Sequence, residues 1–274
     1  MSNFISVIVF FITTIFYYIV LFPKLTITNI NNLSNGYNSS KYKSLASYFL
    51  LVLVSQIAIN TYLLLNSCGG SITHNLGYSF LLTFIPWFVI FGIVIIALII
   101  YPGFKSAFSN VIGYYLVAST ANNLLSKILI NSDLDSTIDN STIENPDTKK
   151  NLKETADVML KMFGNLSIMI NQIVPSNFNE YWNMLTPLMK PEYKTDNLVK
   201  QQLLDIVSLR DKIGEACWYI YTGILLIFIT QYKIKTTGCS ANKESIKQSQ
   251  ANYTKITNEH NKKNEKLKSK IYTV

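Results

Sequence analysis

Very few residues in this chain are of types and spacings that could carry out chemistry. The only histidines are His74, shortly after a glycine pair, and His260, in a lysine-rich C-terminal segment. Neither lies near the partners that a nucleophile, a general base or a metal-ligand set requires. The chain also lacks a Walker phosphate loop, a GxSxG nucleophile elbow, an HExxH zinc motif and a dinucleotide-binding fingerprint. We therefore predict a protein that is not an enzyme and that holds no cofactor.

One acidic segment has the residue types of a cation site. Its carboxylates are Asp133, Asp135, Asp139, Glu144 and Asp147. Calcium loops place their ligands at fixed intervals around a central glycine, and this segment has neither the spacing nor the glycine. Its polar composition is typical of a solvated linker, so we predict no metal site.

Long apolar runs determine the fold class. Residues 4–22 contain no charged side chain, and as a helix they reach about 28 Å, close to the roughly 30 Å of a bilayer's hydrocarbon core. Residues 45–65 and 78–101 have the same character, and residues 216–230 form another apolar run, within a last span predicted at 214–232. Pro86 is expected to kink the third helix, because proline lacks a backbone donor. The sequence thus predicts an all-α, multi-span helical membrane protein.

The remaining chain divides by composition. Residues 1–130 form the predicted membrane domain, residues 131–213 a small helical extramembrane domain, and residues 233–274 a lysine-rich tail. Within the extramembrane domain, apolar residues recur at spacings of three and four, which predicts an amphipathic helix that ends at Pro175. These residues are Leu152, Ala156, Met159, Phe163, Leu166, Ile170 and Ile173.

Two further helix starts are expected after that proline. Asn177 followed by Glu180 is typical of a capped short helix. Asp196 is positioned to cap a long helix, and no glycine–proline break separates this helix from the last span. We therefore predict one continuous helix from the extramembrane domain into the membrane.

The number of crossings depends on residues 111–130. With four spans, the basic loop 23–44 and the basic tail lie on opposite faces, which conflicts with the lysine excess expected on the cytoplasmic side. A fifth, marginal crossing at 111–130 removes the conflict, although this stretch carries Lys127 and several polar side chains. In the four-span alternative, residues 104–116 lie along the interface as an amphipathic segment. We favour five crossings only slightly, because the long loop that follows exceeds the length over which the charge rule applies.

The tail is the most strongly charged part of the chain. Residues 233–274 carry 10 lysines against three glutamates. The apolar positions fit an amphipathic helix, and disorder in the unbound tail is the alternative. Such a tail suits anionic lipid, where each lysine contributes about 1 kcal/mol, or an acidic partner. Nothing in it predicts sequence-specific nucleic acid binding. The candidate interaction residues are Lys262, Lys263, Lys266, Lys268 and Lys270.

Residues 101–114, YPGFKSAFSNVIGY, carry the most specific local pattern. The segment resembles a PGW-x-x-PFSN-T-x-GY type of sequence found in membrane-embedded structural proteins of large icosahedral DNA viruses, the phycodnavirus and mimivirus group. It departs from that pattern at Phe104, Ala107 and Val111, and it covers 14 of 274 residues. Physically, Pro102 and Gly103 are expected to end the third span. The candidate interaction residues here are Phe104, Lys105, Phe108 and Asn110.

The resemblance implies a minor capsid protein that links the inner membrane of a virion to the capsid shell. Its partners would be the lipid bilayer and the capsid or other minor capsid proteins, and it would pass through host endomembranes during assembly. The alternatives are a membrane channel or transporter, and a viral entry or fusion factor. Transport proteins usually place ionisable residues within their spans, and the N-terminal spans have none. Gln56 and Asn60, four apart on one face, are predicted to form hydrogen bonds between helices.

Overall fold

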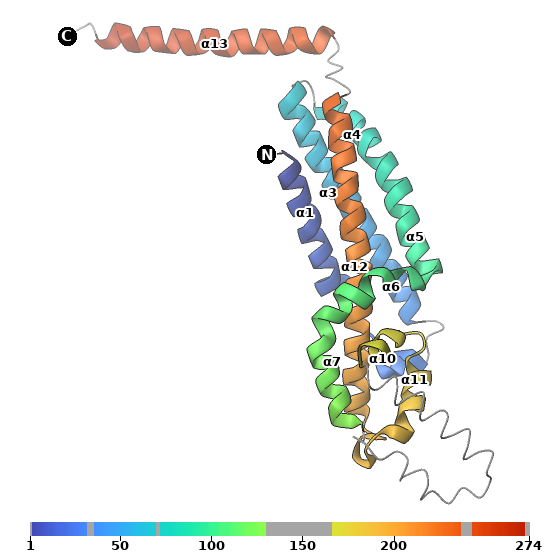
Figure 1. Ribbon diagram of the computed structural model, residues 1–274. Helices are drawn as coiled ribbons and strands as arrows, with labels where there is room; N and C mark the ends of the chain where they lie inside the picture. Colours follow the sequence, from blue (N-terminus) through green and yellow to red (C-terminus); the bar gives the residue numbers. More distant parts are fainter. Residues whose placement is uncertain (1, 32–35, 70–71, 130–165, 237–242, 272–274) are drawn as a thin grey trace, which may run out of the picture. The chain divides into compact units, whose positions relative to one another are not determined.

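The computed structural model describes residues 2–31, 36–69, 72–129, 166–236 and 243–271 (Figure 1). The described chain consists of helices and contains no strand, only an isolated bridge between Leu129 and Met189. The predicted all-α class is therefore confirmed. The candidate metal segment at 133–147 lies outside the described residues, as does most of the predicted helix before Pro175.

Four helical runs within the described residues are long and apolar enough to cross a membrane. They are Phe4–Leu21, Tyr37–Ser67, Asn75–Ile100 and Asn197–Thr236. The first contains α1 (Ser2–Phe16), the second lies in α3 (Tyr37–Cys68), the third combines α4 (Ile72–Pro86) with α5 (Gly92–Ile100), and the last is α12 (Asn197–Thr236). Membrane character is therefore well supported by length and composition.

Pro86 interrupts the third run without starting it. The run begins at Ile72, and Pro86 is followed by a π-helical turn at Trp87–Phe91. Because proline cannot donate a backbone hydrogen bond, the regular α-helical pattern cannot continue through it. The prediction that Pro86 lies inside a span, and not at its beginning, is confirmed.

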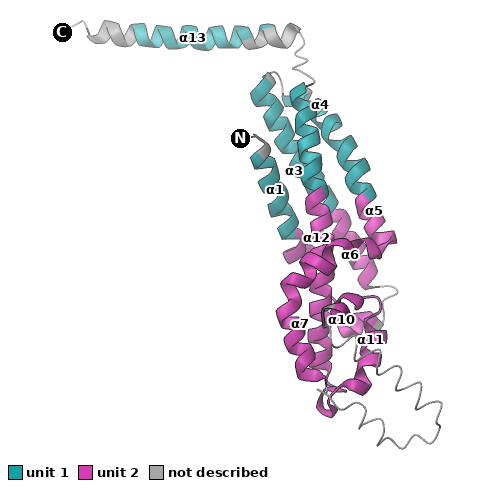
Figure 2. Cartoon of the chain, in the orientation of Figure 1, with its two compact units in different colours: residues 1–16, 48–93, 222–274 teal, residues 17–47, 94–221 magenta. Residues whose placement is uncertain are grey.

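The chain forms two compact units, shown in Figure 2. Unit 1 comprises residues 1–16, 48–93 and 222–274, and unit 2 comprises residues 17–47 and 94–221. The helices α3 and α12 contribute residues to both units. As predicted, α12 is one continuous helix, and the Asp196 carboxylate caps it by accepting the backbone N–H of Leu198 at 2.8 Å.

The interior of unit 1 combines aromatic rings with neutral polar pairs. The Phe10 ring centroid lies 5.7 Å from that of Trp87 and 6.3 Å from that of Phe91. Gly223 has no side chain where the Phe10 ring lies, and a Cβ there would overlap the ring. The small residue therefore lets α1 and α12 approach closely.

Gln56 and Asn60 both form hydrogen bonds between helices, as predicted. The Ser6 hydroxyl of α1 donates to Gln56 Oε1 at 2.6 Å, and Gln56 Nε2 donates to the backbone oxygen of Ser6 at 3.2 Å. Asn60 Nδ2 donates to the Thr83 hydroxyl of α4 at 2.9 Å. Both amides are nearly inaccessible, so these bonds join α3 to its neighbours within unit 1.

Unit 2 is built around a continuous apolar core. The core is formed by α7 (Tyr114–Ile128), α10 (Leu166–Gln172), α11 (Phe178–Leu185), the first part of α12, and α2 (Ile27–Asn31) with the residues before it. Ile170 and Ile173, from the predicted apolar stripe, are fully buried in it. The predicted cap at Asn177 is wrong, since its side chain binds Val174 N and Gln172 O instead of the start of α11.

The residues after the first span belong to the same core as α12. Gln201 accepts the backbone N–H of Ile27 at 3.0 Å and donates to the backbone oxygen of Leu25 at 3.2 Å. A crossing at 111–130 would place residues 23–31 and residue 201 on opposite faces of the membrane. The contact excludes that arrangement, so the preference for five crossings is wrong. The segment instead forms α7, which buries Val117, Ala121, Leu124, Leu125 and Ile128 in unit 2.

The tail contains α13 (Lys243–Ile271). Every side chain of α13 whose exposure is described is exposed, including Tyr253 at 74% and Ile256 at 66%. The predicted helix is therefore present. Because none of its described side chains is buried, this part of α13 gains little stability from packing.

Candidate interaction site around Lys105

The segment after the third span turns sharply into a helix with two unlike faces. It runs through η3 (Pro102–Lys105), α6 (Ser106–Phe108) and η4 (Ser109–Gly113) into α7. Lys105 and Ser109 point inward and are 5% and 2% exposed. The outward face is apolar and consists of Phe104, Val111, Ile112, Tyr115 and Leu116, all exposed. This polarity matches the interfacial segment of the four-span alternative.

Lys105 is the centre of a buried ion cluster. Its Nζ lies 2.7 Å from Glu215 Oε2 and 3.1 Å from Asp211 Oδ2, both on α12. Lys41 Nζ on α3 lies 3.7 Å from the same Glu215 oxygen. The Tyr219 hydroxyl donates to the other oxygen, Oε1, at 3.3 Å. Three segments distant in sequence are therefore joined through one carboxylate.

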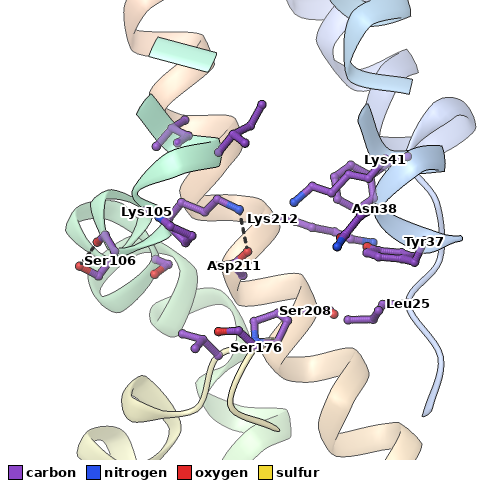
Figure 3. Close-up of a pocket in the computed structure, with 18 of the residues that line it drawn as sticks. Leu25, Tyr37, Asn38, Lys41, Lys105, Ser106, Ser176, Ser208, Asp211 and Lys212 are labelled. Carbon is purple, nitrogen blue, oxygen red and sulfur yellow. Dashed lines mark hydrogen bonds and ion pairs between the residues drawn. The ribbon is translucent and has the colours of Figure 1, made fainter. Parts of the chain in front are cut away.

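The environment of Lys105 favours its charged form. Burial by itself lowers the pKa of the ammonium, but the attraction of Glu215 and Asp211 and their hydrogen bonds outweigh this and raise the pKa above its ordinary value. The side chain is therefore a permanent cation at neutral pH. Figure 3 shows its bond to Asp211 across the face of α12.

Two glycines allow this segment to contact α12 closely. A Cβ at Gly214 would lie 2.6 Å from Ser109 Cβ and 2.8 Å from the backbone oxygen of Lys105. A Cβ at Gly113 would lie 2.7 Å from the backbone oxygen of Arg210. Real side chains do not reach such distances, so glycine is required at both positions for this packing.

Aromatic contacts complete the junction with α12. Trp218 Nε1 donates to the backbone oxygen of Phe104 at 2.9 Å. The Phe108 and Trp218 ring centroids are 5.1 Å apart in an edge-to-face arrangement. The hydrogen bond joins the backbone of this turn to α12.

Arg210, the only arginine of the chain, is fully buried in unit 2. Its guanidinium donates to the backbone oxygen of Ile170, to Asn171 Oδ1 at 3.3 Å and to the backbone oxygen of Ile173 at 2.8 Å. It thereby supplies donors to carbonyls at the end of α10, where helical partners are missing. In the sequence, Arg210 lies at helical spacing from Ile206, Val207 and Ile213, and this position among apolar residues is the only signal of its role.

A cavity of about 500 Å³ lies inside unit 2, beside the ion cluster (Figure 3). In Figure 3, Lys105 and Ser106 lie on one side of α12, and Tyr37, Asn38 and Lys41 lie on the other. Lys212 and Asp211 of α12 also line the cavity. The arrangement provides several amines, hydroxyls and amides around one space.

The predicted interaction residues differ in what they contact. Phe104 is exposed, Phe108 is half-buried against Trp218, and Asn110 is half-buried with its backbone oxygen bound by Asn171 Nδ2. Lys105 is engaged by the carboxylates of its own chain and presents no free ammonium to a partner. On α13, Lys262 and Lys263 are exposed, whereas the side chains of Lys266, Lys268 and Lys270 lie outside the described residues.

Within the described residues, no group of three or more histidine, cysteine, aspartate or glutamate side chains is arranged to hold a metal. No family model, no curated protein and no solved structure matches this chain. The site is therefore interpreted from its own geometry.

Proposed function

We propose that the protein is a non-enzymatic structural membrane protein in which the spans anchor a rigid helical unit at the membrane surface. The observation that carries the proposal is the chemistry of unit 1. Its described spanning residues, within 4–16, 48–69, 72–93 and 222–232, include no Asp, Glu, Lys or Arg. A path for protons or ions usually requires such groups at membrane depth.

Unit 2 supports an anchoring role through its connections. The Lys105 cluster, the two glycine contacts and Arg210 fix the segment after the third span, the start of α3 and α10 to one helix, α12. These internal bonds make the unit rigid. Its described residues include no set of groups arranged for a reaction. The exposed apolar face that begins at Phe104 suits the lipid interface.

At a finer level, we propose a minor capsid protein that links a virion's inner membrane to its capsid shell. The support is the resemblance of residues 101–114, whose Lys105 and Gly113 provide the contacts that join this segment to α12. The basic helix α13 would provide a contact for anionic lipid or an acidic partner.

Reconstitution into liposomes tests the structural role against transport. The purified chain should produce no flux of ions or small solutes above that of protein-free liposomes.

Fractionation of virions tests the proposed capsid role. Detergent extraction of purified virions should leave the chain in the shell fraction by mass spectrometry, and its absence from virions would contradict the capsid role.

A further inference from the structure

The cavity in unit 2 lies next to residues at which two spans end. Phe22 follows the last residue of the first span, and Leu98 and Ile99 are among the last three residues of the third. All three line the cavity, together with Pro102. Helix ends of this kind lie at the level of the lipid headgroups, where the hydrocarbon core gives way to phosphate and water.

The cavity carries an excess of positive charge. Lys41, Lys105 and Lys212 line it, whereas Asp211 is the only carboxylate among the lining residues, with Glu215 behind Lys105. Lys105 forms ion pairs with both Asp211 and Glu215, whereas Lys41 Nζ lies 3.7 Å from the Glu215 carboxylate. Three ammonium groups therefore share two close carboxylates, and Asp205, outside the cavity lining, attracts Lys212 from further away.

Lys212 is the ammonium group with no described carboxylate at ion-pair distance, although Asp205 and Glu215 attract it from further away. It forms no ion pair with any described residue, and its Nζ lies 4.4 Å from the centroid of the Phe22 ring. Lys41 Nζ approaches the same ring at 5.8 Å. Two like charges over one ring are compatible with an anion that would lie near both.

The other lining groups suit a phosphate ester. Asn38, Ser176 and Ser208 contribute amide and hydroxyl groups, which can donate to phosphate oxygens. Apolar side chains, including Leu25, line the remainder and could contact the glycerol and the start of an acyl chain. Basic pockets between membrane helices recognise anionic headgroups in this way.

We propose that this cavity binds a phosphate group, that of an anionic phospholipid, between Lys41 and Lys212. The phosphate supplies the close anionic partner that Lys212 lacks, and the lipid tail leaves along the ends of the spans. The site is independent of the proposed structural function, because a lipid could bind an anchor, a transporter or a fusion factor equally well. Loss of lipid binding and appearance of solute flux are therefore separate results.

The test uses the full-length protein in nanodiscs of phosphatidylcholine containing a small fraction of phosphatidic acid. Native mass spectrometry after detergent release measures the retained lipid. Lys212→Gln should weaken retention of phosphatidic acid about five-fold, since one lysine near a membrane surface contributes about 1 kcal/mol. Lys43→Gln is the matched control, because Lys43 is exposed, belongs to the same helix as Lys41 and does not line the cavity. It should change retention less than two-fold. The tail is identical in all variants.

A second variant places a negative charge at the cavity and leaves every lysine unchanged. Ser106 is exposed and lines the cavity, so Ser106→Asp should fold and should weaken retention by repulsion. Equal losses in Lys212→Gln and Lys43→Gln would overturn the proposal, as would equal retention of phosphatidic acid and phosphatidylcholine.

Inorganic phosphate distinguishes a lipid phosphate from free phosphate in solution. If phosphate alone raises the unfolding temperature in Lys43→Gln but not in Lys212→Gln, while phosphatidic acid is not retained, the lipid assignment is overturned.

Discussion

Unit 1 buries neutral polar groups that bond across helices, whereas unit 2 buries an arginine and a cluster of opposite charges. In unit 1, Gln56 bonds to Ser6 and Asn60 to Thr83, and large apolar side chains such as Phe4 and Ile12 face outward. In unit 2, Lys105 and Glu215 are both nearly inaccessible. A neutral pair costs little in lipid, but a charge must be matched wherever it is buried. The contrast fits a lipid-embedded unit and a unit at the membrane surface.

The largest expected effect concerns membrane sidedness and is all-or-none. Lys24 and Asn197 are exposed; Lys24 precedes Leu25, and Asn197 lies two residues before Val199, both in the unit 2 core. Cysteines at these two positions should therefore react with an impermeant maleimide on the same side of sealed vesicles. A cysteine at Gln250, beyond the last span, should react only on the other side. The background carries serine in place of Cys68, Cys217 and Cys239. If Lys24→Cys instead reacts together with Gln250→Cys, a fifth crossing exists and the description of unit 2 fails.

Arg210→Met should cause the largest loss of stability in unit 2. The substitution keeps an apolar stem but removes the donors to the carbonyl groups of Ile170 and Ile173. Each buried carbonyl left without a donor costs about 1–3 kcal/mol, so the free energy of unfolding should fall by about 3–5 kcal/mol. Pulse proteolysis in detergent measures it. Lys194→Met, at a half-exposed position, should change it by less than about 0.5 kcal/mol. Similar values for the two variants would show that Arg210 does not stabilise α10.

Lys105→Met should be the next most costly change. It leaves Glu215 buried with only the more distant Lys41, and breaking a buried ion pair in this way costs about 3 kcal/mol. Adding Glu215→Leu should restore most of the loss, because the unmatched charge is then gone. Because the pKa of Lys105 is raised, its contribution is fully present below its ordinary pKa of 10.5 and disappears only as the pH rises through the raised value. Losses that simply add in the double variant would argue against a coupled pair.

Two glycine-to-alanine changes, one in each unit, should have opposite signs. Gly214→Ala in unit 2 forces a Cβ against the backbone of Lys105, at a cost of about 1–3 kcal/mol. Gly92→Ala in unit 1 meets nothing within 4 Å, so the better helix propensity of alanine should stabilise it by about 0.5–1 kcal/mol. Unfolding temperatures of the two variants provide the comparison. A stabilising Gly214→Ala would mean that α12 and the Lys105 segment do not pack closely.

Features encoded by short stretches of sequence could be predicted. The spans, the Pro86 interruption, the Asp196 cap and the continuous α12 depend on hydropathy and on local backbone chemistry. The hydrogen bonds of Gln56 and Asn60 to neighbouring helices could be predicted as well. Two amides on one face of an apolar helix have few other partners. Such inferences require no knowledge of which distant segments meet.

The site depended on contacts between distant residues, and there the sequence was insufficient. Lys105 and Asp211 are 106 positions apart, so no spacing rule relates them. The charge asymmetry favoured a fifth crossing, but the contacts of Gln201 with Leu25 and Ile27 exclude it. Lys105 was counted as a residue for a partner, whereas its carboxylate partners are supplied by α12. The sequence identifies these side chains as polar, but the groups that they contact can be identified only from the fold.

The smallest expected effect is in unit 1, at the neutral pairs. Replacing both Gln56 and Asn60 with leucine removes their hydrogen bonds to Ser6 and Thr83 but keeps apolar volume between the helices. Hydrogen bonds between membrane helices contribute about 0.6–2 kcal/mol, so the free energy of unfolding should fall by no more than about 2 kcal/mol. This is less than the loss expected from either charged group of unit 2, and the double variant should resemble the parent chain in liposome flux assays. A solute flux that is present in the parent and abolished in the double variant would show that these amides line a path, and the contrast between an inert membrane unit and a charged surface unit would then be lost.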